Sequence, residues 1–221
     1  MNVKIIVTYE MPKKAKTVFT SDEMRAGEAL LLAEDFNKTG RAKHIEFVDR
    51  HDSSWTVKEL KGYVQGIQTE PHNVVVYFDG GFDVQTKRAG LGIAIYYNQN
   101  GKSYRLRKNA PADELDSNNE AEYAAFYFAL QELELLGVHH LPVEFIGDSQ
   151  VVISQLTGLW PTLERQLNRW ADRIEQKLDQ LGIQPDYQQV SRKKNAEADQ
   201  LASQAMRGID ISGTIELIRK E

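Results

Sequence analysis

The apolar run NVVVYFDGG, at residues 73–81, constrains the fold of this chain more than any other feature. It lacks the alternation of a half-exposed strand, so both faces of the strand that it predicts must be covered, as in the centre of an α/β sheet. A second apolar run, LPVEFIGD at residues 141–148, also ends on an aspartate. Buried strands of this kind require helices packed on both faces of one sheet.

The segments around these two runs predict the rest of the layered unit. LGIAIYYN and KSYRLRK flank the turn signal NQNG and predict an antiparallel hairpin. Helices are expected from Ser117 to Gly137, after Asp148, over residues 163–182 and from a cap at Asn195. PDYQQV predicts a last strand between the final two helices. The order βββαβααβα describes an α/β fold with a mixed five-stranded sheet and helices on both faces.

The residues before this layered unit predict a separate small α+β unit with the order ββαβα. Its expected strands cover residues 4–10, 17–21 and 42–49, and its helices start from serine caps at Ser21 and at residues 53–54. The polar stretch QTEPHN, with one proline, marks the seam. The predicted division is residues 1–70, a linker at 71–73, a main domain at 74–210 and a C-terminal tail at 211–221.

Composition narrows the classes of protein that are open to the chain. Cysteine is absent, which excludes disulfides, thiolate metal sites and a cysteine nucleophile, and fits a reducing cytoplasm. There is no run of about 18 apolar residues and no signal peptide, so we expect a cytoplasmic protein that does not cross a membrane. The net charge of −5 argues against a protein that coats nucleic acid through charge alone.

The helix that begins in SNNEAEYAAFYFAL opens with two glutamates before a run without a polar face. Ser117 and Glu120 fit a capping box, in which the serine caps the helix and the glutamate reaches back. Glu122 has no such structural role. A carboxylate at the end of a buried helix is costly unless it is paired, hydrogen-bonded or bound to a metal. Glu122 is therefore expected to have partners elsewhere in the chain.

Three further acids are placed to join Glu122. Asp79 and Asp148 end the two buried strands, where ligands collect in open α/β sheets, and Asp199 lies near the start of the last helix. Each acid also has a simpler structural interpretation. Asp79 could be a turn residue, Asp148 a helix cap, Asp199 a complement to the helix dipole and Glu122 a side chain that reaches solvent.

Four short segments resemble the signature segments of the ribonuclease H family and occur in the family's order: FDGG, SNNEAEY, GDSQVV and NAEADQLA. The similarity extends over residues 74–208. It implies a ribonuclease H-like sheet, with catalytic and metal-binding roles for Asp79, Glu122, Asp148 and Asp199. The resemblance also implies substrate contacts from a second set of residues: Gly80, Gly81, Ser117, Asn118, Asn119 and Gln150.

The activity implied by this resemblance is endonucleolytic hydrolysis of the RNA strand of RNA–DNA hybrids, with 5′-phosphate and 3′-hydroxyl ends. Two Mg²⁺ or Mn²⁺ ions would lie about 3.5–4 Å apart between the four acids. Oxygen ligands without cysteine suit these ions better than zinc. The expected partner is the hybrid, and the chain is expected to act as a monomer. An exonuclease is disfavoured, because two glycines follow Asp79 where an Asp-x-Glu would be expected. The alternative is a non-catalytic nucleic-acid-binding protein of the same fold.

The chain departs from the family pattern near the last acid and in the middle of the domain. QVSRKKNAEAD has no histidine loop and resembles the shorter form of the family. Arg192 or Lys193 could assist the reaction, with a solvated basic cluster as the alternative. TGLWPTLERQLNRW replaces the family's basic protrusion, and its Trp160 and Trp170 are expected to pack in the protein rather than to stack on bases.

The N-terminal unit could supply some of the phosphate contacts that a basic protrusion would otherwise make. Its candidates are the basic residues between the first two predicted strands, Lys13, Lys14 and Lys16. A solvated loop without contacts is the alternative interpretation. The unit could therefore bind substrate, recruit a protein partner or only support folding.

Overall fold

The computed structural model describes residues 1–10, 15–50 and 52–218, and it divides the chain into two compact units, Met1–Thr69 and Glu70–Glu221. Each unit has its own hydrophobic core. No helix in the described part of the chain is long and apolar enough to cross a membrane.

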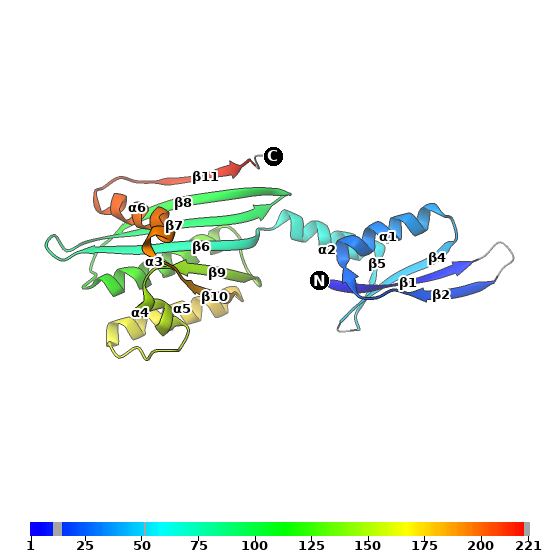
Figure 1. Ribbon diagram of the computed structural model, residues 1–221, viewed down its shortest axis with the longest axis horizontal. Coiled ribbons are helices and arrows are strands. Elements are labelled where there is room, and N and C mark those ends of the chain that lie inside the picture. The colour runs from blue at the N-terminus through cyan, green and yellow to red at the C-terminus, as the bar shows by residue number, and fades with distance from the viewer. Residues whose placement is uncertain (11–14, 51, 219–221) are drawn as a thin grey trace. The chain divides into compact units, whose positions relative to one another are not determined.

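The C-terminal unit is a mixed sheet with helices on both faces (Figure 1). Its strands are β6 (His72–Asp83), β7 (Arg88–Gln99), β8 (Lys102–Ala112), β9 (Pro142–Gly147), β10 (Gln184–Gln189) and β11 (Ser212–Leu217). Its helices are α3 (Asn118–Leu135), α4 (Gln150–Leu156), α5 (Arg165–Leu181), the 3-10 turn η1 (Arg192–Asn195) and α6 (Ala196–Met206). The strand order is β10-β9-β6-β7-β8-β11, in which β9 lies parallel to β6 and to β10 while the other pairs are antiparallel. The predicted mixed α/β architecture is confirmed.

Glycines in the two central strands set how closely helices approach the sheet. A Cβ on Gly80 of β6 would lie 2.1 Å from the backbone carbon of Ala121 in α3. A Cβ on Gly92 of β7 would lie 2.2 Å from the backbone oxygen of Ala198 in α6. Asp79 pairs with Gly92 and Gly80 with Leu91, so the two glycines belong to adjacent rows and face opposite sides of the sheet. The helices α3 and α6 therefore cover opposite faces of β6 and β7.

Local signals placed the hairpin and the long helices correctly. Asn100 and Gly101 both have positive φ, of 54° and 73°, and form the two-residue loop between β7 and β8. This conformation matches the right-handed twist of the paired strands, which is why Asn-Gly predicts it. Gly182 ends α5 in the left-handed conformation with φ of 62°.

Two boundaries of the predicted main domain are wrong. The sheet has six strands within the described residues, because β11 pairs with β8 antiparallel inside the segment 211–221 that was predicted to be a tail. The residues of SGTIEL are almost all exposed, so no buried apolar pattern marks this edge strand in the sequence. At the other end, β6 begins at His72, within the segment 71–73 that was predicted to be a linker.

The N-terminal unit is an antiparallel sheet packed against two helices. Its elements are β1 (Asn2–Glu10), β2 (Lys16–Thr20), β3 (Met24–Arg25), α1 (Ala26–Lys38), β4 (Ala42–Asp49), β5 (Ser54–Thr56) and α2 (Val57–Thr69). The strand order is β2-β1-β4-β5, and the short β3 pairs with β1. The core contains Val3, Ile5, Val7, Phe47 and Leu60. The predicted order ββαβα thus gains two short strands, β3 and β5, one before each helix.

Both serine caps predicted for this unit are wrong. The Ser21 hydroxyl oxygen accepts a hydrogen bond from the Ile5 amide at 3.0 Å, and α1 starts five residues later, after Arg25. Thr56, rather than a serine, caps α2. Its hydroxyl oxygen accepts from the Glu59 amide at 3.2 Å, while the Glu59 carboxylate accepts from the Thr56 amide at 2.8 Å. A serine followed by acids is therefore an ambiguous signal for a helix start, because the serine hydroxyl can also accept a hydrogen bond from the backbone of a neighbouring strand.

Candidate active site

Asp79 lies on β6, the strand at the centre of the sheet. It is only 6% exposed, and it points to the same face as Gly92, the face covered by α6. The strand continues to Asp83, so Asp79 lies within β6 rather than in a turn after it. The turn acid is Asp83, whose carboxylate accepts a hydrogen bond from the Gln85 amide at 2.8 Å. The interpretation of Asp79 as a turn residue is therefore wrong.

Glu122 enters the site from the start of α3, on the other side of β6. The Ser117 side chain caps α3 by accepting from the Glu120 amide at 3.2 Å, as predicted. The carboxylate of Glu120 turns away from the site and accepts from the Asp116 amide and from the Trp170 indole. Glu122 is left 4% exposed beside Gly80, whose missing Cβ lets α3 approach β6. Gly80 thus has a packing role, and its predicted substrate contact stays a prediction.

Asp148 follows β9, which runs parallel to β6 and brings its C-terminal end to the same edge of the sheet. The N-cap of α4 is Ser149, whose hydroxyl oxygen accepts from the Val152 amide at 3.3 Å. The alternative role of Asp148 as the helix cap is therefore wrong. Oxygen atoms of Asp79, Glu122 and Asp148 all lie within 4.8 Å of one another.

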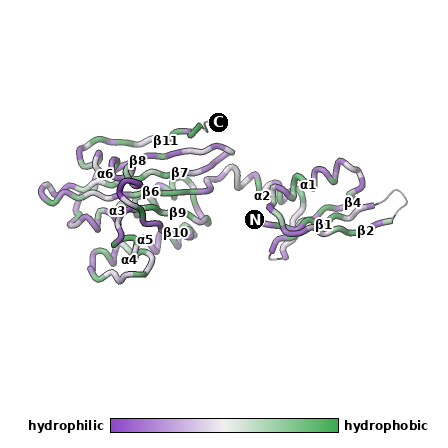
Figure 2. The backbone as a smooth tube through the Cα atoms, in the orientation of Figure 1, coloured by the Kyte–Doolittle hydropathy of each residue, from purple (hydrophilic) through white to green (hydrophobic). Residues whose placement is uncertain are grey.

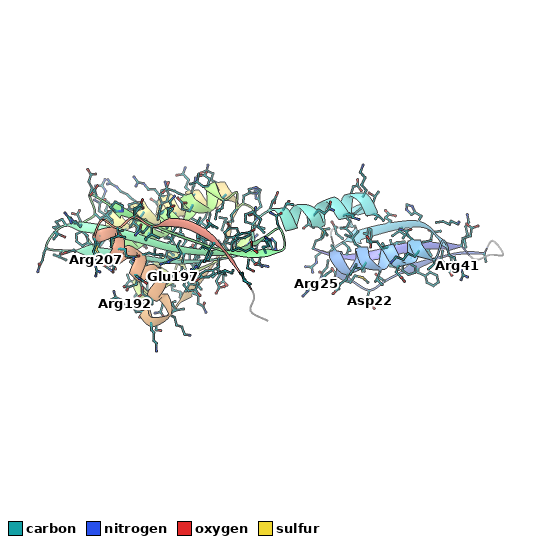
Figure 3. The ribbon with its side chains drawn as sticks, turned by 90° about the horizontal axis from the view of Figure 1, so that it is seen from above. Asp22, Arg25, Arg41, Arg192, Glu197 and Arg207 are labelled. Carbon is teal, nitrogen blue, oxygen red and sulfur yellow. The ribbon has the colours of Figure 1, made fainter. Side chains whose placement is uncertain are left out.

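Asp199, the fourth predicted acid, lies beside these three rather than among them. It sits on α6, and its Oδ1 accepts hydrogen bonds from both Nε, at 3.1 Å, and Nη2 of Arg192. Figure 3 labels Arg192, which projects from η1, the turn that precedes α6. Asn195 holds this turn to the sheet. Its side-chain amide donates to the Phe78 carbonyl at 2.9 Å. The expected side-chain cap of α6 by Asn195 is therefore wrong.

These side chains line one cleft of about 280 Å³ at the end of the sheet. Its lining residues are Asp79, Gly80, Gly81, Asn118, Glu122, Asp148, Ser149, Arg192, Asp199, Ser203 and Met206. Of the other predicted site residues, Ser117, Asn119, Gln150 and Lys193 lie outside this lining. Ser203 and Met206 were not anticipated. Ser203 follows Asp199 by four residues, and this helical spacing is the signal that could have placed it on the same face of α6.

A family model described as Reverse transcriptase-like matches residues 77–205. Ribonuclease HI of Halobacterium salinarum is 38% identical over 93 residues, which cover 41% of this chain and 44% of that protein. The crystal structure of RNase H1 from Halobacterium salinarum superposes with a TM-score of 0.53 at 28% identity, covering 61% of this chain and 98% of that one. The chain belongs to the ribonuclease H family.

Other relatives show how far the similarity extends. The structure of LC11-RNase H1 in complex with an RNA/DNA hybrid has a TM-score of 0.55 at 27% identity and covers 62% of this chain and 98% of that one. The uncharacterized protein YpeP of Bacillus subtilis is 42% identical over 188 residues, covering 85% of this chain and 83% of that protein. An alignment of that length exceeds the ribonuclease H unit, so it also includes part of the N-terminal unit.

Burial and mutual repulsion dominate the electrostatics of the ribonuclease H site. Burial first, and then the charges of Asp79 and Asp148, raise the pKa of Glu122 to about 9, while a backbone hydrogen bond from Gly80 acts to lower it. Burial also raises the pKa of Asp79 to about 7, with added repulsion from Asp148 and Asp199. The Arg192 guanidinium opposes both shifts. When these carboxylates ionise, the positive groups of the protein alone do not balance their negative charge.

The ribonuclease H site fits a divalent cation. Oε2 of Glu122 is buried and has no hydrogen-bond partner among the residues that the structure describes. An orphaned buried oxygen of this kind costs free energy unless a cation or donor meets it. Asp79, Glu122 and Asp148 offer carboxylate oxygens, the ligands that Mg²⁺ and Mn²⁺ prefer. Asp79, Glu122 and Asp148 would hold the ion, with Asp199 at the side of the cleft.

The metal-free protein should lose stability as pH rises. Glu122 and Asp79 have pKa values in the folded state above their ordinary values of 4.5 and 3.8. At pH values between the ordinary and the raised pKa of each residue, the folded state therefore binds more protons than the unfolded state. Their contribution is fully present below the unfolded pKa values and is lost as pH rises through about 7 and about 9. Urea unfolding in a chelator, from about pH 5 to about pH 9, should show this decline. Glu122→Gln should flatten it, and equal slopes for both proteins would contradict the assignment.

Proposed function

We propose that the C-terminal unit is a metal-dependent endoribonuclease that hydrolyses the RNA strand of RNA–DNA hybrids, leaving 5′-phosphate and 3′-hydroxyl ends. The observation that carries this proposal is the convergence of Asp79, Glu122 and Asp148 within 4.8 Å from three separate elements. The two relatives named Ribonuclease HI and RNase H1, and the hybrid-bound LC11-RNase H1, support the choice of substrate. The cysteine-free composition supports a cytoplasmic location.

The residues of the cleft would have different roles in this reaction. Two Mg²⁺ or Mn²⁺ ions, when bound, would supply a nucleophilic hydroxide and neutralise charge on the leaving 3′-oxygen. The carboxylates of Asp79, Glu122 and Asp148 are held by β6, α3 and the end of β9, so the metal ions would meet a preformed set of ligands. Asp199, which Arg192 holds through Oδ1, would add its other carboxylate oxygen from α6.

Recognition of the hybrid would come from polar groups around the cleft. Asn118 is exposed and lines the cleft beside Asp79 and Glu122, so its amide can reach a sugar or phosphate next to the scissile bond. Asn119 and Gln150 sit at the starts of α3 and α4. Their amides both donate and accept, as reading a 2′-hydroxyl requires.

The deciding experiment is cleavage of a labelled RNA–DNA hybrid with and without Mg²⁺. Single-stranded RNA, duplex RNA and duplex DNA serve as matched substrates. We expect cleavage of the RNA strand of the hybrid only, with Mg²⁺ or Mn²⁺ present, and internal cuts rather than release of end nucleotides. Binding of the hybrid without cleavage under all metal conditions would favour the alternative, a non-catalytic nucleic-acid-binding protein.

Arg192 should contribute to turnover, whereas its neighbour Lys193 should not. Arg192 holds Asp199 and lowers the pKa of both Asp79 and Glu122, while Lys193 has no ion pair among the described residues and lies outside the cleft. Loss of hydrogen bonds to a charged group should lower kcat of Arg192→Ala by about tenfold to a hundredfold. Lys193→Ala is the matched control and should keep the wild-type kcat. Equal effects of the two variants would show that general positive charge, not the Arg192 contact, matters.

The N-terminal unit should strengthen hybrid binding. The C-terminal unit has 22 acidic and 16 basic residues, so it holds a polyanion poorly by itself. Lys16 is exposed and only loosely paired with Glu10 at 3.8 Å, while Lys13 and Lys14 lie outside the described residues. Deleting residues 1–69 should raise KM and flatten its salt dependence, with kcat little changed. Michaelis constants at two salt concentrations measure this, and equal constants with equal slopes would exclude a substrate-binding role.

A further inference from the structure

The strand β2 leaves one edge of the N-terminal sheet open. In the order β2-β1-β4-β5, no described strand pairs with the outer side of β2, and all five of its residues are exposed. The Ser21 amide donates to the Ile5 carbonyl at 3.0 Å, toward β1. Because antiparallel pairs alternate, Lys16, Val18 and Thr20 direct their backbone N–H and C=O groups outward.

The two edges of this sheet are built differently. The opposite edge, β5, has three residues, and its Trp55 is held by Tyr63 of α2, with ring centroids 5.5 Å apart, and by Asp49. The sequence of β2, KTVFT, contains no proline and places apolar side chains at its middle. Exposed edges are normally blunted by shortness, charge or proline, because an open edge templates pairing with another strand. The open edge of β2 is suited to such pairing.

An apolar groove lies along β2 on the helix side. It has a volume of about 560 Å³ and is lined by Ile5, Val7, Tyr9, Phe19, Thr20, Ser21, Leu32 and Phe36. Phe19 is 53% exposed and Leu32 of α1 is 43% exposed, while Val18, on the other face, is 60% exposed. Figure 2 shows β2 as a hydrophobic stretch within this unit. The edge therefore offers apolar contacts together with unpaired backbone groups.

Charge is distributed unequally along this edge. Lys16 lies at the start of β2 opposite Glu10 of β1, with its Nζ 3.8 Å from the Glu10 carboxylate. Beside Glu10, the Tyr9 hydroxyl accepts from the Arg41 guanidinium at 2.8 Å. Asp22 follows the end of β2, and its carboxylate has no ion-pair partner among the described residues. Within this unit, Figure 3 shows Asp22 between Arg25, at one end, and Arg41 toward the other end. A strand of the same sequence that runs antiparallel along β2 would bring Lys16 near the partner's Asp22.

We propose that two copies of this chain associate through β2, in an antiparallel pairing centred on Val18. Val18 would face the partner's Val18, and Lys16 would face the partner's Thr20, so the outward backbone groups of both strands are satisfied. Phe19 would lie diagonal to the partner's Phe19, at roughly 7–8 Å, within reach of aromatic side chains. The two grooves then form one apolar layer. Such a twofold contact is closed, so it gives a dimer rather than a fibre.

The association is tested on the full chain without nucleic acid, by sedimentation or light scattering over a range of concentrations. The wild type is expected at twice the chain mass of 25.2 kDa. Val18→Lys places two like charges opposite each other and should give monomers, as should Val18→Glu. Mixing the Val18→Lys and Val18→Glu proteins should restore a dimer that contains one of each. Val84→Lys changes a valine of similar exposure, 71%, in the C-terminal unit and should leave the wild-type dimer intact.

The outcomes are separable because each variant is first checked for native circular dichroism. A monomeric wild type at all concentrations would overturn the proposal and leave the groove to another partner. A dimer that survives both Val18 substitutions would place the contact elsewhere. Monomers in both variants whose mixture stays monomeric would overturn the pairing centred on Val18.

Discussion

Asp148→Asn is expected to abolish hybrid cleavage while the protein stays folded. Asparagine keeps the size of the side chain, and Ser149 rather than Asp148 caps α4, so the helix start is unaffected. The change removes a negative charge from the group formed with Asp79 and Glu122. Loss of about 4 kcal/mol of transition-state stabilisation corresponds to about a 1000-fold fall in kcat at saturating Mg²⁺.

The same substitution should raise the melting temperature of the metal-free protein. The charge of Asp148 raises the pKa of both Asp79 and Glu122, and removing it relieves that repulsion. Asp172→Asn, an exposed aspartate on α5, is the matched control and should change neither kcat nor melting temperature. Turnover within about twofold of wild type in Asp148→Asn would refute the metal-binding assignment, because twofold is well under 1 kcal/mol.

Gly80→Ala is expected to destabilise the C-terminal unit strongly. The added methyl would lie 2.1 Å from the backbone carbon and 2.2 Å from the backbone oxygen of Ala121, and backbone atoms cannot turn aside as a side chain can. The helix α3 must move away from β6. We expect a loss of about 3 kcal/mol or more, which lowers the melting temperature by roughly 6 °C or more.

Gly213→Ala is the matched control for this prediction. Gly213 lies in β11 of the same unit, and an added Cβ there meets nothing within 4 Å. Its melting temperature should stay within a few degrees of wild type. Calorimetry of both variants checks the difference. Equal melting temperatures would show that α3 can shift without loss of stability. Close packing of α3 would then not explain why residue 80 is a glycine.

The sequence by itself determined the elements whose signals are local. The unbroken apolar run that became β6, the Asn100-Gly101 hairpin turn and the Ser117 cap each depend on residues within a few positions of one another. Their outcomes follow from backbone sterics and from burial of one face or both. The sequence also predicted a cluster of four acids, of which Asp79, Glu122 and Asp148 lie together, although Asp79 lies within β6 rather than at its end.

Only the tertiary structure decided which partner each polar group takes. Asp199 pairs with Arg192, Asn195 donates to Phe78 instead of capping α6, and Ser21 is held by Ile5 of the neighbouring strand. A hydroxyl, amide or carboxylate can form several alternative hydrogen bonds within its own segment, and these bonds have similar free energies. Packing of distant segments selects among them, because a buried polar group must be satisfied where it finally lies. The edge strand β11 was likewise decided by tertiary structure, because its exposed residues form a strand only by pairing with the edge of β8.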